Sequence, residues 1–150
     1  MSLSSGNYST IADDESSLAK TLLERLKPSE WPFDLNDLPI GCALVGGAIR
    51  DGLRGEFHSR PDLDFIIPSN AIGLAKKFSK RFKAKFIVLD QKRDIARIIF
   101  DDWIIDFSKQ IGNTLNEDLL HRDFTVNAIA LIFDSKSPKI IDPASGIKDL

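Results

Sequence analysis

The chain has 150 residues, of which 43% are hydrophobic and 28% are charged, and its formal net charge at pH 7 is −2. This length and composition predict one soluble globular domain that buries a core of its own, rich in phenylalanine. The charge balance excludes a domain that holds nucleic acid by bulk positive charge alone. Such a contact would need a local basic patch or parts outside this sequence.

The cysteine and histidine content excludes two kinds of site. Cys42 is the single cysteine, so an internal disulfide is impossible, and its apolar neighbours predict a buried strand thiol. The two histidines and this cysteine are too scattered for a zinc site. No run approaches the ~20 apolar residues of a membrane span, and the N-terminus has no signal-peptide pattern. We therefore predict a cytoplasmic protein with no membrane partner.

The chain divides into a polar N-terminus and one domain. Residues 1–13 are rich in Ser, Thr, Gly and Asn and are predicted to be disordered, whereas residues 14–150 form the domain. Helical periodicity begins at Asp14 and ends at Pro28, and a proline-rich connector anchored by aromatic side chains follows. The next predicted elements are, in chain order, a strand at 42–45, a helix at 48–53, a strand at 62–67, a helix at 70–82 and strands at 85–90, 95–100 and 103–108.

The last third of the chain contains two further apolar runs. Residues 116–133 predict a short helix, a break near Arg122 and Asp123, and then an apolar helix. A strand, a turn and an incomplete helix close the sequence. This order of elements predicts an α/β (α+β) fold, in which a mixed sheet of about five strands carries helices on one face.

A glycine pair, Gly46 and Gly47, separates the strand at 42–45 from the short helix after it. Glycine lets the backbone approach a ligand closely, and the free amides at a helix start favour anions, phosphate above all. Arg50 lies about one turn into this helix and can donate two hydrogen bonds to the same anion. We predict that these residues bind nucleotide phosphates; the alternative is a tight turn with a solvent-exposed arginine.

Two aspartates, Asp62 and Asp64, open the next strand. Residues i and i+2 of a strand point to one face, so the two carboxylates project together while Leu63 points into the core. Paired carboxylates repel each other unless a cation lies between them, and Mg2+ prefers such oxygen ligands together with substrate phosphates. We predict Asp62 and Asp64 as catalytic metal ligands with Mg2+ as the cofactor; the alternative is an exposed turn with two solvated acids.

A third acid, Asp106, lies in an otherwise apolar strand and alternates to the face opposite Ile105 and Phe107. It either faces solvent or completes a catalytic cluster of three carboxylates, depending on which strand lies beside it. A phosphate-binding corner next to paired metal ligands predicts two-metal nucleotidyl transfer. In that reaction one metal activates an attacking 3′-hydroxyl and the other stabilises the departing pyrophosphate.

Three blocks of sequence occur in a distinctive order: LVGGAIRDGLRG followed by DLDF, then HRDFTVNAIA, then IDPASGIKDL. In this order they resemble the head domain of the bacterial tRNA nucleotidyltransferase and poly(A) polymerase family, the class II branch of the polymerase-β-like nucleotidyltransferases. The resemblance covers about residues 43–150. It implies a mixed palm sheet that carries Asp62 and Asp64 as metal ligands, with phosphate contacts at Gly47 and Arg50.

The second block implies further contacts with the nucleotide. Arg122 matches a nucleotide-contacting arginine of the family, and Asp123 and Asn127 match positions that help to select the ribose. Apart from the resemblance, Asp123 would be a helix N-cap and Asn127 would make a structural hydrogen bond. Asp106 matches an acidic position of the family. The family usually has two arginines before Asp-Phe-Thr, and here the first is His121.

The resemblance implies template-independent transfer of nucleotides from ATP or CTP to an RNA 3′ end, with tRNA as the acceptor. Addition of CCA, CC, A or poly(A) is decided in a helical neck that follows the head in this family. Because the sequence stops where the neck would begin, we expect a fragment of a longer enzyme. Two alternatives remain open: a minimal nucleotidyltransferase for a non-RNA substrate, and a non-catalytic nucleotide- or RNA-binding module. Gly-Gly in place of the usual Gly-Ser disfavours the first, and the intact aspartate pair disfavours the second.

Overall fold

The computed structural model describes residues 3–56, 58–133 and 137–150, and for residues 3–13 it describes the backbone alone. The strands are β1 (Ala43–Val45), β2 (Leu63–Ile67), β3 (Lys85–Asp90), β4 (Ile95–Phe100), β5 (Trp103–Lys109), β6 (Ala130–Phe133) and β7 (Pro138–Ile141). The helices are α1 (Leu3–Leu26), α2 (Gly47–Leu53), α3 (Ala71–Phe82) and α4 (Leu115–Leu120). The 3-10 turns are η1 (Pro28–Glu30), η2 (Leu35–Asp37), η3 (Thr125–Asn127) and η4 (Gly146–Asp149).

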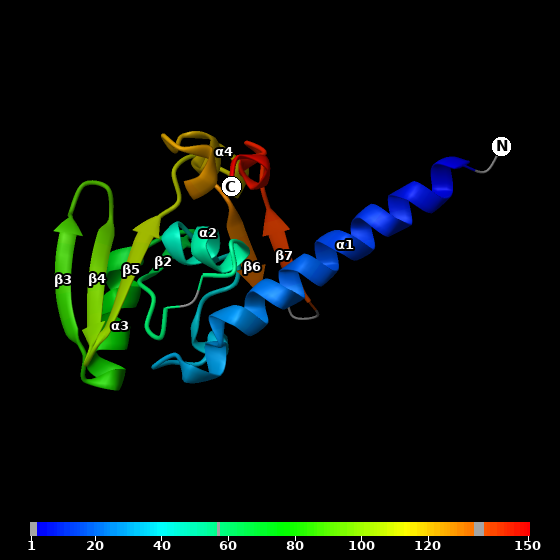
Figure 1. The fold of residues 1–150 in the computed structure, drawn as a ribbon. Coiled ribbons are helices and arrows are strands. Elements are labelled where there is room, and N and C mark those ends of the chain that lie inside the picture. Colours follow the sequence, from blue (N-terminus) through cyan, green and yellow to red (C-terminus); the bar gives the residue numbers. More distant parts are fainter. Residues whose placement is uncertain (1–2, 57, 134–136) are drawn as a thin grey trace.

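The described residues form one mixed sheet of seven strands, in the order β3-β4-β5-β2-β1-β6-β7 (Figure 1). Within this sheet β2 and β5 are parallel neighbours, and the other pairings are antiparallel. Helices α1, α2 and α3 contribute to the larger core cluster on one face. The predicted α/β (α+β) class, the mixed sheet and the helix-covered face are therefore confirmed, with seven strands in place of the expected five or so.

The strand that the sequence analysis missed is β6, in the C-terminal third of the chain, whereas the closing strand that it expected is β7. The prediction of an apolar helix ending near residue 133 is wrong, because after α4 the chain makes the η3 turn and enters β6. Ala130 and Leu131 are both fully buried, on opposite faces of the sheet. A short apolar run of this kind fits a buried helix and a buried strand equally well, and here pairing of Leu131 with Leu44 makes it a strand.

Helix α1 is longer than the sequence predicts. Residues 3–13, expected to be disordered, continue the helix that was expected from Asp14, and residues 1–2 lie outside the described residues. Figure 1 shows this end of α1 projecting beyond the sheet, while the rest of the helix packs against β7 and α2. A helix that packing has already nucleated adds residues without a second nucleation cost, which explains the extension. Among the described helices, none combines the length and the apolar character needed to cross a membrane.

Aromatic side chains form the centre of the main core. Phe65 of β2 is 1% exposed, and its ring centroid lies 5.9 Å from that of Trp31, 6.0 Å from that of Phe33 and 6.0 Å from that of Phe107. These edge-on and tilted contacts add to the hydrophobic gain of burial. The Trp31 indole also donates a 3.0 Å hydrogen bond to the carbonyl of Leu26. The connector between α1 and β1 is therefore anchored by its aromatic residues, as the sequence predicts.

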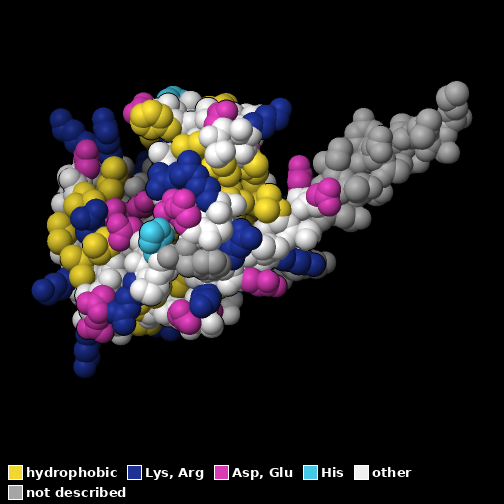
Figure 2. Space-filling model, viewed as in Figure 1, with side chains coloured by type: hydrophobic (Ala, Val, Ile, Leu, Met, Phe, Trp, Pro, Cys, Tyr) yellow, Lys and Arg dark blue, Asp and Glu magenta, His cyan; other side chains and the backbone are white. Residues whose placement is uncertain are grey.

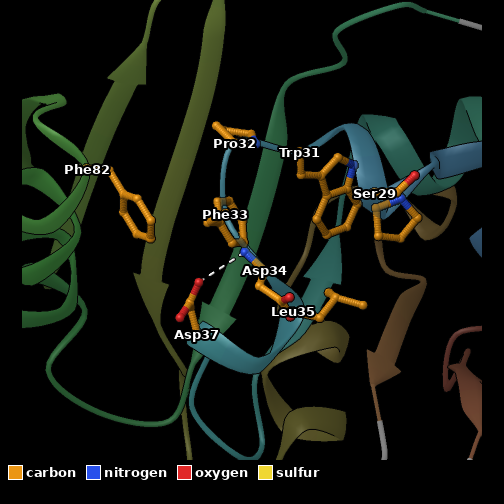
Figure 3. A pocket seen from close by; sticks show the side chains of 9 residues that line it. Ser29, Trp31, Pro32, Phe33, Asp34, Leu35, Asp37 and Phe82 are labelled. Atoms are coloured by element: carbon orange, nitrogen blue, oxygen red, sulfur yellow. Dashed lines mark hydrogen bonds between the residues drawn. The ribbon is translucent and has the colours of Figure 1, made fainter.

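The connector also borders an open cavity of about 550 Å3 (Figure 3). Its lining consists of connector residues and one residue of α3, namely Pro28, Ser29, Trp31, Pro32, Phe33, Asp34, Leu35, Asp37 and Phe82. Figure 3 shows the Asp37 carboxylate accepting the backbone N–H of Asp34, at 3.0 Å. Asp34 in turn accepts the N–H of Asn36, at 2.9 Å, so the two acids cap η2 and hold this wall of the cavity in shape.

The opposite face of the sheet is covered only in part. Leu119 of α4 packs there with Val45, Ile66 and Ala130 in a smaller core cluster. Asp64 is the neighbour of the buried Phe65 in β2, so its side chain projects from this second face. The larger core thus fixes one face of β2 while the other face carries the predicted carboxylate.

Replacing Phe65 with Ala is expected to lower the free energy of unfolding by about 3–5 kcal/mol, because it leaves a cavity among packed rings. Urea denaturation followed by circular dichroism measures this change. Phe124→Ala is the matched control: this ring is 66% exposed, and its loss should cost less than about 1 kcal/mol. Equal losses in the two variants would contradict the assignment of the core.

Candidate active site

The turn from β1 into α2 brings the glycine pair against a carboxylate. Gly46 has φ 80° and ψ −147°, a conformation that residues with a side chain rarely adopt. A Cβ at position 46 would lie 3.0 Å from Oδ2 of Asp64, and Val45 is the antiparallel partner of Asp64 in the sheet. Gly46 therefore both turns the chain and lets this carboxylate lie against the backbone. The predicted phosphate corner and the predicted metal ligand do meet.

The guanidinium of Arg50 is held in one orientation over the same corner. Its Nε donates a 2.9 Å hydrogen bond to Oδ1 of Asp51, and its Nη1 donates a 3.1 Å hydrogen bond to Oδ1 of Asn127. Its Nη2 is the atom nearest to a Cβ built on Gly47, at 3.3 Å. The arginine thus points one nitrogen toward the glycine that opens α2. The structural hydrogen bond that we considered for Asn127 is present, and its partner is Arg50.

The three predicted carboxylates lie on or beside one face of the sheet. Asp64 of β2 is in register with Asp106 of the parallel strand β5, and the side chains alternate to the same face because Phe65 and Phe107 are both buried on the other. Of the two placements open for Asp106, the structure has the one beside Asp64. Asp62 is exposed and immediately precedes β2.

An arginine that the sequence did not single out engages one of these acids. Arg97 of β4 donates from Nε to Oδ1 of Asp106 at 2.8 Å and from Nη2 to Oδ2 at 3.1 Å. This fork raises the pKa of Arg97 and compensates part of the negative charge on the sheet face. Arg97 and Asp106 are directly opposite each other in the β4–β5 hairpin. The alternation of side chains along the two predicted strands could therefore have suggested this ion pair.

Asp64 is the acid whose protonation the site perturbs most clearly. Burial, and after it the negative charge of Asp106, raise the pKa of its carboxyl group from 3.8 to about 6. Arg122 lowers this pKa, Asp62 raises it, and Arg97 lowers it. The remaining excess of negative charge favours any cation that can approach the carboxylate.

A cavity of about 370 Å3 brings several of the predicted residues together. Gly47, Arg50, Asp62 and Asp64 line it, and so does Arg60 from the loop before β2. In the view of Figure 2, acidic, basic and histidine side chains gather near the middle of the molecule, over α2 as placed in Figure 1. Arginine and carboxylate side chains therefore share one hollow beside the glycine corner.

A larger cavity, of about 720 Å3, lies on the same face of the sheet. Arg122 and Asp123 line it together with Ser108, which follows Asp106 by two positions in β5 and so shares its face. Asp123 is exposed, and Phe124 is the N-cap of the η3 turn that follows, so the N-cap alternative for Asp123 is wrong. The predicted nucleotide-binding residues are thus divided between two cavities. The two regions interact electrostatically, because the charge of Arg122 lowers the pKa of Asp64.

The position of Arg122 depends on a buried acid that the sequence did not reveal. Asp118 is 3% exposed; its Oδ2 accepts the N–H of Ile111 at 2.7 Å, and its Oδ1 lies 3.5 Å from Nε of Arg122. That Nε is buried and has no hydrogen-bond partner among the described residues. The sequence could have suggested this ion pair, because an acid and an arginine four residues apart are neighbours on a helix surface.

A second acidic group could hold a metal ion. The ligand atoms of Asp51, Glu56 and His58 all lie within 4.8 Å of one another. Among the described residues, the three predicted aspartates do not form a group as tight as this one. However, Oδ1 of Asp51 already accepts from Arg50, and its Oδ2 lies 3.2 Å from Nε2 of His58. Both oxygens of this carboxylate are therefore engaged within the protein.

A mixed palm sheet, a glycine corner and in-register aspartates on the open face define the class of polymerase-β-like nucleotidyltransferase folds. The comparison with known families agrees, since the model of the poly A polymerase head domain matches residues 42–150. The chain belongs to this family.

Two curated relatives carry names of tRNA-modifying enzymes. A CC-adding tRNA nucleotidyltransferase of Synechocystis sp. (strain ATCC 27184 / PCC 6803 / Kazusa) is 49% identical over 119 residues, which cover 79% of this chain and 28% of that protein. An A-adding tRNA nucleotidyltransferase of Deinococcus radiodurans is 38% identical over 126 residues, covering 84% and 26% respectively. The chain therefore spans little more than a quarter of the length of these relatives.

Solved structures give the same likeness. A CCA-adding enzyme in complex with CTP superposes with a TM-score of 0.69 at 28% identity, covering 88% of this chain and 34% of that one. A tRNA nucleotidyltransferase complexed with a primer tRNA and an incoming ATP analogue gives a TM-score of 0.62 at 30% identity, covering 72% and 32%.

The raised pKa of Asp64 predicts a pH dependence of stability in the metal-free protein. A carboxyl whose folded pKa lies above its ordinary value stabilises the fold while protonated, so stability falls as pH rises from about 4 through about 6. The loss amounts to at most about 3 kcal/mol. Denaturation in the presence of a chelator at several pH values measures it. Asp64→Asn should remove this part of the pH dependence, and the exposed Asp101→Asn should leave it unchanged; identical profiles for wild type and Asp64→Asn would contradict the prediction.

Proposed function

We propose that this chain is the catalytic head of an enzyme that transfers nucleotides from ATP or CTP to the 3′ end of an RNA, with tRNA as the acceptor class. One observation carries the proposal: Asp64 lies against the Gly46 backbone and shares a cavity with Arg50, so metal ligand and phosphate ligand face the same space. The names of the relatives support nucleotidyl transfer to tRNA.

The phosphate-binding half of the site consists of Gly47 and Arg50. The glycine leaves room for a phosphate oxygen to approach the backbone, and the arginine supplies a planar fork that matches it. Because two of its nitrogens are already fixed by Asp51 and Asn127, the guanidinium is oriented before the ligand arrives. Such preorganisation favours binding of the triphosphate and charge stabilisation during its cleavage.

Mg2+ is the metal that the donor set fits. Asp62 and Asp64 offer only carboxylate oxygens, which suit a hard cation, and the raised pKa of Asp64 reflects negative charge that a cation would relieve. We assign Asp62 and Asp64 as the metal ligands, with Asp106 as a third catalytic acid at their side. When bound, the metal supplies activation of the attacking 3′-hydroxyl and neutralisation of the departing pyrophosphate.

The remaining residues hold the nucleotide and balance charge. Arg122 and Asp123 line the second cavity on this face, which supports their assignment to the nucleotide, with Asp123 at the ribose. Asp118 keeps Arg122 in place, and Arg97 prevents Asp106 from adding its full charge to the carboxylate pair. The contribution of the protein to catalysis is thus to orient the triphosphate and the metal relative to each other.

We also propose that residues 14–150 act as one head domain in the cytoplasm. The matched family range begins at residue 42, yet Leu22, Trp31 and Phe33 from the preceding segment belong to the main core. A domain cut at residue 42 would lose these contacts. The tRNA-modifying relatives support the cytoplasm as the place of action.

Nucleotide titration tests the binding half of this proposal. The isolated chain should bind ATP and CTP weakly, with affinities within about threefold of each other, and only when Mg2+ is present. In isothermal calorimetry, Asp62→Asn and Asp64→Asn should each lose the nucleotide binding that requires Mg2+. The variant Asp101→Asn, at an exposed position, should keep it. A strong preference for one base, or Mg2+-dependent binding by both aspartate variants, would refute the assignment.

Transfer itself can be tested in a chimaera. Residues 14–150 would replace the corresponding segment of the Synechocystis relative, and incorporation of labelled CTP into tRNA that lacks its 3′ end would be followed. Asp64→Ala in this chimaera should lower the rate by about a thousandfold or more, because the metal site is lost while the fold remains. Retained transfer with an intact circular dichroism spectrum would overturn the metal assignment.

A further inference from the structure

Arg50 has two of its N–H groups occupied within the protein. Nε donates to Asp51 in the same helix, and Nη1 donates to Asn127, which lies 77 residues further along the chain. An arginine side chain carries five N–H donors, so donors remain for a ligand. Among the described residues, Nη2 near Gly47 has no hydrogen-bond partner. The orientation of that nitrogen therefore depends on two oxygens, one local and one distant.

The distant oxygen, Oδ1 of Asn127, belongs to a turn that is held in place by its neighbours. Asn127 ends η3, which packs against η4 near the end of the chain. Gly146 of η4 lies so close that a Cβ there would come within 1.9 Å of the carbonyl oxygen of Thr125. Asp142 holds η4 in turn, because its carboxylate accepts the N–H of Gly146 at 2.6 Å and that of Ile147 at 3.1 Å. The η3 turn is therefore packed tightly against η4, and it also contacts α2.

We propose that Asn127 is a positioning residue, which fixes the guanidinium of Arg50 for the triphosphate and does not select the ribose. This inference rests on the proposed function, in which Arg50 binds phosphate. The side-chain carbonyl of Asn127 is the second anchor of the fork, and without it the guanidinium would be held at Nε alone. Rotation about the last side-chain bonds would then carry Nη2 away from Gly47. The effect of Asn127 therefore passes through Arg50.

Inorganic triphosphate is the decisive probe, because it has neither ribose nor base. Its binding to the intact chain with Mg2+ would be measured for wild type, Arg50→Ala, Asn127→Ala and the double variant. We expect Asn127→Ala to weaken binding about five- to tenfold and Arg50→Ala at least as much. The double variant should bind no more weakly than Arg50→Ala alone, since both changes remove one function. Asn113→Ala, at an exposed asparagine, is the matched control and should bind as wild type does.

A second pair of measurements separates positioning from a merely structural role and from ribose contact. The 15N relaxation of the Arg50 Nε–H group should report a more mobile side chain in Asn127→Ala while the midpoint of thermal unfolding changes little. The ratio of ATP to dATP affinity should stay the same. Asn127→Ser, whose shorter side chain cannot reach Nη1, should behave like Asn127→Ala and serves if the alanine variant folds poorly.

The outcomes distinguish this inference from the proposed function. If Arg50→Ala weakens triphosphate binding while Asn127→Ala does not, the positioning role is refuted and the phosphate site stands. A changed ATP to dATP ratio in Asn127→Ala would also refute it, in favour of ribose contact. If Arg50→Ala leaves triphosphate binding unchanged, the phosphate assignment and the positioning role are both overturned.

Discussion

The contact between the backbone of Gly46 and the carboxylate of Asp64 is the constraint on which the site depends. Antiparallel pairing of Val45 with Asp64 brings the carboxylate beside position 46, where its Oδ2 would lie 3.0 Å from a Cβ. The missing side chain leaves room for it. The same glycine redirects the chain into α2, which carries Arg50. One residue without a side chain therefore determines how far the anion-binding and cation-binding groups lie from each other.

Charge is balanced around this contact by groups from different strands and turns. Burial and the neighbouring acids make the ionised form of Asp64 costly, and the arginines at positions 97 and 122 relieve only part of that cost. Each of these arginines has its own acid, Asp106 and Asp118 respectively. Among the described residues, the two aspartates at positions 62 and 64 are left without an arginine of their own. Stability is given up at Asp64, as is common where a protein must attract a cation.

The sequence predicted the parts of this protein that are local. The glycine corner and the hairpin strands follow from patterns of a few residues, and they were placed correctly. Of the two aspartates expected in the next strand, Asp64 lies in β2 and Asp62 immediately precedes it. β6 was mistaken for a helix, because its short apolar run takes its form from pairing with β1 and β7. The fork from Arg97 to Asp106 joins neighbouring strands of a hairpin, and strand alternation could have suggested it. No local pattern encodes the hydrogen bond from Arg50 to Asn127, because it depends on the packing of η3 against α2.

The interior position of β1 in the sheet has a consequence for the order in which the protein folds. β1 pairs with β2 on one side and with β6 on the other. Because β6 follows β1 by almost ninety residues, the second of these pairings can form only after most of the chain has been synthesised. During synthesis the aspartates and the glycine corner leave the ribosome well before β6 and η4 do. Contacts between segments so far apart are slow to form, since much chain must be ordered at once. The assembly of a competent phosphate pocket is therefore a late event, and a nascent chain that halts before η4 carries the chemical groups without their arrangement.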